Sequence, residues 1–490
     1  MTDLAVLARG IVVAGVPDAD AVAAHPPLAG YVFFARNGES VRELRPLADA
    51  LRARAGDLPP LLAIDQEGGR VARLREGVEP MPPMMSLGAA GDLELAGRAG
   101  EQVAFDLRRA GCNLDFAPVL DLALDARNVA IGTRSLGSDP QRVAALGMAF
   151  AGGMQRGGML SCAKHFPGHG ATGTDSHVAL PVLGGDARTL RERDLVPFAA
   201  AARSVPAMMS AHVVVPALDP QRPATLSPAV MTDLLRGDLA FEGVAFTDCL
   251  EMKALDATGG VRRALAALAA GADALLFSHD FALALETVDA IVAAVNGGAL
   301  PQERLEEAYG RVQKLRTMTA APLDADAFPP HPGVGREIAR RGVTLVRGVP
   351  HADPLASLAV AFGAERATLA REAPALVELL APVDPGEEDV RAILEALAKS
   401  GRRPLLLTQR AHLHAAQARA VRAIVEGYPD ALVASLAEPF DLPLFGAARH
   451  LIAAYGDDAA ATGGLADVLF GGSMPQGRLP VDLASASAAL

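Results

Sequence analysis

Short apolar runs that could form strands alternate with helix-like segments along the first 320 residues of this 490-residue chain. Each run is four to eight residues long and rich in Val, Leu, Ala, Ile or Phe, which favours buried strands. The runs cover residues 11–14, 30–35, 61–65, 113–120, 160–163, 207–213, 243–247 and 274–278. Helical periodicity is expected at 41–55, 92–110, 142–157, 189–203, 227–237, 260–271, 281–296 and 301–319. The alternation predicts a (β/α)8 TIM barrel, whose active site would lie at the carboxyl ends of the strands.

A segment rich in Pro, Asp and Ala follows at residues 321–335 and predicts an ordered, non-helical linker. Beyond it, short strands and helices alternate again, which predicts a smaller C-terminal α/β domain with a largely parallel sheet. We therefore expect a barrel domain at 1–320 and a second domain at 336–490. Neither a GxGxxG nor a GxxxxGK[ST] loop occurs in the second domain, so nothing supports nucleotide binding there.

Charge and composition argue against several classes of protein. The net charge of −12 disfavours a nucleic-acid-binding protein, which would usually carry a basic stripe. No apolar run approaches the length of a membrane span, and the N-terminus lacks a basic signal region, so we expect a cytoplasmic protein. Cys112, Cys162 and Cys249 lie in or beside strand-like runs and are expected to be free thiols. We expect a monomer or a weak homo-oligomer.

Polar residues follow several of the expected strands. Lys164 and His165 come directly after the fifth strand, and charged or imidazole groups follow four others at Asp65, Asp121, His212 and Asp248. Taken alone, each of these could be a helix cap or a turn residue. Together they predict a polar cluster at the mouth of the barrel. Asp248, after a run of small and apolar residues, is expected to be a nucleophile or a base, with a helix N-cap as the alternative.

A glycine-rich loop beyond the fifth strand carries Asp175 and His177. Residues two apart in extended backbone point to the same side, so Asp175 could orient His177 as a proton donor. The alternative is an ordinary loop turn. Arg73 and Arg134 follow the third and fourth strands. With Asp65 they would suit a ligand that has several hydroxyls or a carboxylate, such as a sugar, unless they are surface arginines.

Other catalytic arrangements find less support. His165 and His169 are four residues apart, but Pro167 and Gly168 between them prevent a helical pair of metal ligands. There is no CxxC pair and no GxSxG elbow. Zinc held by residues from separate strands stays possible, but we expect no metal and no cofactor.

Four motifs, read in this order, resemble glycoside hydrolase family 3. They are DQEGGRVAR from residue 65, AIGTRSLGSDP from 130, AKHFPGHGATGTDSHVALP from 163 and GVAFTDCLEM from 243. Within the family they are similar to the β-N-acetylglucosaminidase branch that acts in peptidoglycan recycling. The later stretches REIARRGVTLVRG and GGSMPQGRLPVDL resemble the second domain of the same family.

The resemblance implies a role for each matching residue. Asp248 would be the catalytic nucleophile, His177 the general acid/base and Asp175 the partner of His177. The N-acetylglucosamine unit would be bound by Asp65, Arg73, Arg134, Lys164 and His165. The reaction would retain the anomeric configuration, and a closing loop would have to bring His177 close to Asp248. Where the family often has a second acid after the nucleophile, this chain has Cys249.

The expected partner is therefore a small carbohydrate, a disaccharide or muropeptide with terminal GlcNAc, and neither a nucleic acid nor a membrane. Several alternatives stay open. A phosphorylase could use the same His177, because an imidazole does not repel phosphate as a carboxylate would. Another β-hexosidase branch, a catalytically silent sugar-binding protein and a metal-dependent hydrolase on the same barrel are the others.

Overall fold

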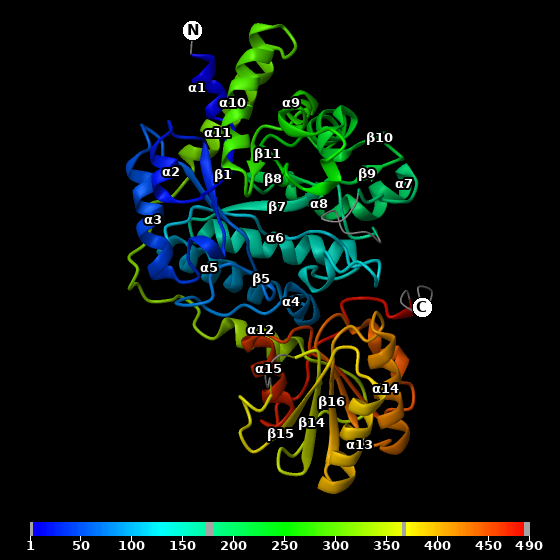
Figure 1. Cartoon of the computed structure of the whole chain (residues 1–490). Coiled ribbons are helices and arrows are strands. Elements are labelled where there is room, and N and C mark those ends of the chain that lie inside the picture. The colour runs from blue at the N-terminus through cyan, green and yellow to red at the C-terminus, as the bar shows by residue number, and fades with distance from the viewer. Residues whose placement is uncertain (1–2, 173–179, 365–368, 485–490) are drawn as a thin grey trace.

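The computed structural model describes residues 3–172, 180–364 and 369–484. The chain forms a larger N-terminal domain and a smaller C-terminal domain, each built on one sheet of mainly parallel strands with its own helices (Figure 1). The architecture is the predicted TIM barrel followed by a second α/β domain. The domain limits at residues 320 and 335 stay predictions.

Eight parallel strands form the larger sheet, in the order β11-β8-β7-β6-β3-β2-β1-β12. Each coincides with a predicted run. They are β1 (Val12–Gly15), β2 (Gly30–Phe33), β3 (Leu61–Ile64), β6 (Leu114–Asp115), β7 (Leu160–Phe166), β8 (Ala207–Ser210), β11 (Val244–Thr247) and β12 (Leu275–Phe277). A parallel bridge between Phe246 and Ala274 joins the two outer strands and closes the barrel.

The fourth predicted strand, residues 113–120, is much shorter in the structure. Only Leu114 and Asp115 form β6, because Pro118 has no backbone N–H to donate to a ladder. Pairing with the next strand resumes at an isolated bridge between Val119 and Lys164. β7 in turn continues to Phe166, so Lys164 and His165 belong to the strand itself.

Helices surround the barrel largely where the periodicity predicts them. They include α3 (Val41–Ala53), α5 (Leu93–Arg109), α6 (Pro140–Arg156), α9 (Gly260–Ala270), α10 (Phe281–Asn296) and α11 (Gln302–Thr317). The predicted helix 189–203 is divided into α7 (Ala187–Thr189), a π-helical turn η3 (Leu190–Asp194) and α8 (Val196–Ala201), and the predicted helix 227–237 is the π-helical η5 (Ala229–Asp238). α5 and α6 cross closely, since a Cβ on Gly153 would lie 2.0 Å from Gly97 O.

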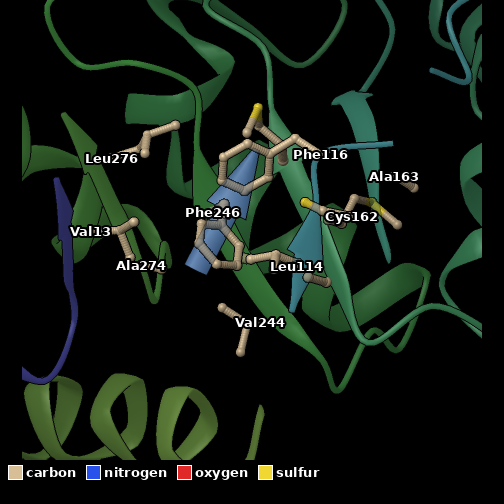
Figure 2. Packing of buried hydrophobic residues seen from close by; sticks show 14 of the residues in the cluster. Val13, Leu114, Phe116, Cys162, Ala163, Val244, Phe246, Ala274 and Leu276 are labelled. Atoms are coloured by element: carbon tan, nitrogen blue, oxygen red, sulfur yellow. The ribbon is translucent and has the colours of Figure 1, made fainter. Parts of the chain in front are cut away.

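Apolar side chains fill the interior of the barrel (Figure 2). The rings of Phe116 and Phe246 meet edge to face with centroids 5.6 Å apart, and both residues are buried. Burying one such ring contributes about 2–3 kcal/mol. The interior is thus a packed core, and polar chemistry is confined to the strand ends.

The smaller sheet has the order β13-β18-β17-β16-β14-β15. Its strands are β13 (Thr344–Arg347), β14 (Ser357–Phe362), β15 (Val377–Ala381), β16 (Arg403–Thr408), β17 (Leu432–Ser435) and β18 (His450–Ala453), and β13 alone of these runs antiparallel. Side chains of α13 (Glu387–Ser400) and α14 (Ala415–Gly427) pack in one core cluster and those of α15 (Ala459–Leu469) in another. Helices therefore cover the sheet on both faces.

Helix α12 (Val334–Gly342) connects the two domains and packs on α4 (Met84–Ala90) and α15 (Figure 1). A Cβ on Gly342 would lie 2.5 Å from Ser86 O, so α12 and α4 can approach this closely only because residue 342 is glycine. Arg341 on α12 forms an ion pair with Asp92 at 2.6 Å. Among the described residues, no helix has the length and apolar character needed to cross a lipid bilayer.

Candidate active site

A cavity of about 190 Å³ opens at the carboxyl ends of the barrel strands. Its polar lining includes Asp65, Glu67, Arg73, Arg134, Lys164, His165, His169, Asp248 and Ser278. The structure therefore brings together six of the eight residues predicted for the site. The other two, Asp175 and His177, lie outside the described residues, and the approach of His177 to Asp248 stays a prediction.

Lys164 lies at the centre of the polar cluster. Its side chain is 2% exposed, and Nζ lies 2.7 Å from Asp65 Oδ1 and 2.6 Å from Glu67 Oε1. Burial lowers the pKa of Lys164, but attraction to the two carboxylates outweighs this and raises the pKa above its ordinary value. The ammonium is therefore held charged in a buried position, which fixes both carboxylates.

Glu67, which the sequence interpretation missed, binds Arg134 through two hydrogen bonds. Arg134 Nε and Nη2 donate to Glu67 Oε2 and Oε1, both at 2.7 Å. Burial would raise the pKa of Glu67, but Arg134 and Lys164 hold it well below its ordinary value. The signal was present in the sequence, since Glu67 comes two residues after Asp65 and can share its side of the chain.

A short antiparallel hairpin after β3 positions Glu67 and Arg73 at the cavity wall. It consists of β4 (Gln66–Gly68), which carries Glu67, and β5 (Val71–Ala72), after which Arg73 follows directly. Arg73 Nη2 lies 3.4 Å from Asp65 Oδ2. Two arginines and a lysine thus surround two carboxylates at the cavity wall.

Asp121 supports His165 and His169, two residues that line the cavity. It is fully buried and accepts hydrogen bonds from His165 Nδ1 at 2.6 Å and from the His169 amide at 2.6 Å. Burial would raise the pKa of Asp121, but His165 and His169 keep it below its ordinary value. His169 lines the cavity with a buried Nε2 that has no hydrogen-bond partner in the described part of the chain. Asp121 is therefore a support, and His169 offers a free ring nitrogen.

Asp248 directly follows β11 and lines the cavity. Burial would raise the pKa of Asp248, but His165, Lys164 and the Cys249 amide at 2.7 Å from Oδ1 hold it below its ordinary value. The alternative, a helix N-cap, does not apply to Asp248, because the N-cap position of the next helical turn, η6 (Lys253–Leu255), is occupied by Met252. It is an ionised carboxylate beside a cation-rich cavity.

His212 holds the backbone next to Asp248. It is buried, and its Nε2 donates to Cys249 O at 2.9 Å while its Nδ1 contacts Thr225 Oγ1 at 2.8 Å. Burial lowers the pKa of His212. The Cys249 thiol lies 3.5 Å from Glu251, and burial raises its pKa to about 12, so it is protonated at neutral pH. In the described ranges, no three His, Cys, Asp or Glu side chains gather so that they could hold a metal ion.

Such a site can bind a polyhydroxylated ligand through charged donors and acceptors, and it can present a carboxylate to an electrophilic carbon. Comparisons with known proteins show which family the chain resembles. The model of the glycosyl hydrolase family 3 N-terminal domain matches residues 12–315. A β-hexosaminidase of Pseudomonas aeruginosa is 42% identical over 289 residues, which are 59% of this chain and 85% of that protein. A β-hexosaminidase of Chromobacterium violaceum is 42% identical over 314 residues, which are 61% of this chain and 85% of that protein.

Solved structures extend the similarity to the second domain. A family 3 β-N-acetylglucosaminidase from Paenibacillus sp. str. FPU-7 superposes with a TM-score of 0.91 at 34% identity over 99% of both chains. NagZ from Neisseria gonorrhoeae, in complex with N-trifluoroacetyl-D-glucosamine, matches 65% of this chain and 92% of its own, with a TM-score of 0.56 at 34% identity. A β-glucoside phosphorylase has a TM-score of 0.82 at 22% identity over 99% of this chain and 95% of its own, which shows the shared fold alone.

The fold and the site define a TIM-barrel glycosidase with a second α/β domain. The chain belongs to glycosyl hydrolase family 3.

Proposed function

We propose that this enzyme is a retaining exo-β-N-acetylglucosaminidase with Asp248 as its nucleophile. The observation that carries the proposal is the position of Asp248 on the wall of a small cavity shared with Asp65, Arg134 and Lys164, where His165 and other groups hold its pKa below its ordinary value. A cavity of about 190 Å³ suits one terminal sugar unit better than an internal segment of a polysaccharide. Similarity to proteins named β-hexosaminidase and β-N-acetylglucosaminidase supports GlcNAc as that unit.

The proposed reaction has two steps. In the first step, Asp248 attacks the anomeric carbon while His177, paired with Asp175, protonates the departing glycosidic oxygen. The product of this step is a glycosyl-enzyme in which the sugar is bonded to Asp248. His177 then takes a proton from water, which attacks the same carbon and releases GlcNAc with its configuration retained. Arg134, Lys164 and Asp65 bind the sugar hydroxyls, so the ring is oriented before the attack.

We further propose that the natural substrate is a GlcNAc-MurNAc muropeptide and that the enzyme works in cell-wall recycling in the cytoplasm. The motifs at residues 163–181 and 243–252 support this, as does the similarity to NagZ from N. gonorrhoeae. The free Nε2 of His169 adds an acceptor or donor for a polar substituent of the sugar.

The test is release of 4-nitrophenol from its β-GlcNAc glycoside, with and without phosphate. We expect wild-type activity that does not depend on phosphate, and a loss of at least ~10³-fold in kcat/KM for Asp248→Asn. Asn can still accept the hydrogen bond from the Cys249 amide, so the fold should be kept.

Asp256→Asn is the matched control, because Asp256 is exposed and lies outside the cavity lining. It should keep wild-type activity. Strict dependence on phosphate would make the enzyme a phosphorylase, and cleavage of the β-glucoside in preference to the GlcNAc glycoside would place it in another branch.

A further inference from the structure

The second domain contributes none of the described residues that line the cavity, which all fall between Val32 and Ser278. NagZ of N. gonorrhoeae matches this chain over only 65% of its length, yet that match covers 92% of NagZ. A barrel alone can therefore form such a site. The second domain of this chain nevertheless contacts the loop at residues 129–134, which ends in Arg134.

Glu438 of the second domain makes this contact. Its side chain is 4% exposed, and its Oε1 accepts a hydrogen bond from the Thr133 amide at 3.0 Å. Arg410 of the same domain donates to Glu438 Oε2 at 2.7 Å and to Oε1 at 3.2 Å. Burial would raise the pKa of Glu438, but Arg410 holds it below its ordinary value. An ionised carboxylate thus binds the backbone of a barrel loop.

The loop is shaped for this carboxylate. Gly132 has φ +48°, and a Cβ there would lie 1.9 Å from Glu438 Oε1. Glycine is therefore required both for the backbone conformation and for the close approach. Gly132 and Thr133 belong with Arg134 to a single 3-10 turn, η2 (Gly132–Arg134).

The same turn fixes the guanidinium that faces the cavity. Arg134 Nη1 donates to Ala130 O at 2.8 Å, and its other two nitrogens bind Glu67. From the barrel side, Arg70 Nη2 donates to Ala130 O at 2.9 Å and to Ile131 O at 3.2 Å. The backbone of the loop is therefore held by Arg70 through its carbonyls and by Glu438 through the Thr133 amide.

We infer that Glu438 is a positioning residue, through which the second domain fixes the turn at Thr133 and so holds Arg134 in the geometry that binds the sugar. The second domain then acts on the reaction without touching the substrate. The inference uses the site of the proposed function, but it holds for whichever glycoside the enzyme cleaves.

The first arm of the experiment measures kcat/KM of the full chain on the glycoside that the wild type cleaves fastest. We expect Glu438→Ala to lower it between about 10- and 100-fold, because misplacing a binding group by a fraction of an ångström has effects of this order. Glu438→Gln keeps an oxygen for the Thr133 amide and should recover most of the activity. Arg341→Met is the matched control, because it removes a different contact between the domains, the ion pair of Arg341 with Asp92 at 2.6 Å. Its kcat/KM should stay within about two-fold of wild type.

A double-mutant cycle separates positioning from general stabilisation. If Glu438 acts through Arg134, then Glu438→Ala should change kcat/KM by less than about two-fold in the Arg134→Met background. Equal losses in both backgrounds would overturn the inference, as would a single Glu438→Ala variant with wild-type activity.

Hydrogen exchange gives a readout that needs no activity. Amides of residues 129–134 should exchange faster in Glu438→Ala than in wild type, and at the wild-type rate in Arg341→Met. Unchanged exchange in Glu438→Ala would also overturn the inference. If the wild-type enzyme does not cleave β-GlcNAc glycosides, the proposed substrate is wrong. The hydrogen-exchange result would still decide whether Glu438 fixes the loop.

Discussion

The two sheets of this enzyme both carry polar residues at the carboxyl ends of parallel strands, but they use them differently. In the barrel, Asp65 follows β3 and Lys164 lies near the end of β7, and both line a cavity. In the second domain, Thr408 ends β16 and Ser435 ends β17, and both are fully buried. Thr408 Oγ1 donates to the buried Asp441 at 2.7 Å.

The difference lies in how the charges are balanced and what they face. The barrel cluster holds its carboxylates with Lys164, Arg73 and Arg134, which can also bind a ligand in the cavity. The carboxyl of Asp441 meets neutral donors instead, and burial raises its pKa. A polar strand end therefore indicates a functional site only where a cavity reaches it; elsewhere it stabilises a loop.

The largest effect on stability should follow from removing the central cation of the barrel cluster. Lys164→Met leaves Asp65 and Glu67 without the ammonium that lies within 2.7 Å of each. We expect the free energy of unfolding to fall by about 3–5 kcal/mol, since removing one partner from a buried ion-pair cluster is costly even though Arg134 and Arg73 still pair with the two carboxylates. We also expect kcat/KM to fall by about 100-fold or more, because the sugar loses a charged donor. Urea unfolding and steady-state kinetics measure the two effects.

Lys399→Met on α13 is the control, because Lys399 is exposed. Its stability should stay within about 0.5 kcal/mol of wild type. A Lys164→Met variant as stable and active as this control would show that the cluster does not depend on its ammonium.

Sequence alone predicted the barrel, the second domain and six residues of the cavity because each rests on local rules. Apolar runs mark strands, and the residue after a parallel strand points to the mouth, so Asp65 and Asp248 could be found. Glu67 was missed because it lies beyond the strand end, in a hairpin that the strand pattern does not indicate, and only its spacing of two residues from Asp65 could have pointed to it. The contact of Glu438 with Thr133 spans 305 positions, and no local pattern reports which loops of two domains meet.

An intermediate effect should follow from the second-domain cluster. Thr408→Val keeps the shape of the side chain but removes the hydroxyl that donates to Asp441 Oδ2. We expect the free energy of unfolding to fall by about 1–3 kcal/mol, because a buried acceptor loses its partner. In contrast to Lys164→Met, kcat/KM should stay within about two-fold of wild type. Thr317→Val at the exposed end of α11 is the control. If Thr408→Val lowered kcat/KM without lowering the free energy of unfolding, the contrast between the two domains would be wrong.

The smallest effect should be a change in how stability depends on pH, at a second-domain carboxyl that contrasts with Asp248. Asp458 caps α15 through Oδ1, which accepts from the amides of Ala460 and Ala461 at 3.0 and 3.1 Å. Its Oδ2 is buried without a hydrogen-bond partner in the described part of the chain. Burial, together with the charge of Asp457, raises the pKa of Asp458 from 3.8 to about 6, whereas the cations beside Asp248 lower the pKa of that residue.

A carboxyl whose pKa is raised by folding contributes stability below pH 4, and this contribution is lost as the pH rises through about 6. Asn at position 458 keeps the cap and cannot ionise. Relative to wild type, Asp458→Asn should therefore gain about 1–2 kcal/mol between pH 4.5 and 7.5, a value reduced from the full shift because the residue is only half-buried. Asp248→Asn should show no such gain, since Asp248 is already ionised across this range. The measurement is urea unfolding of the wild type and of Asp458→Asn at pH 4.5 and 7.5. If the two proteins differed in stability by the same amount at both pH values, Asp458 would titrate in the folded protein as it does in the unfolded chain.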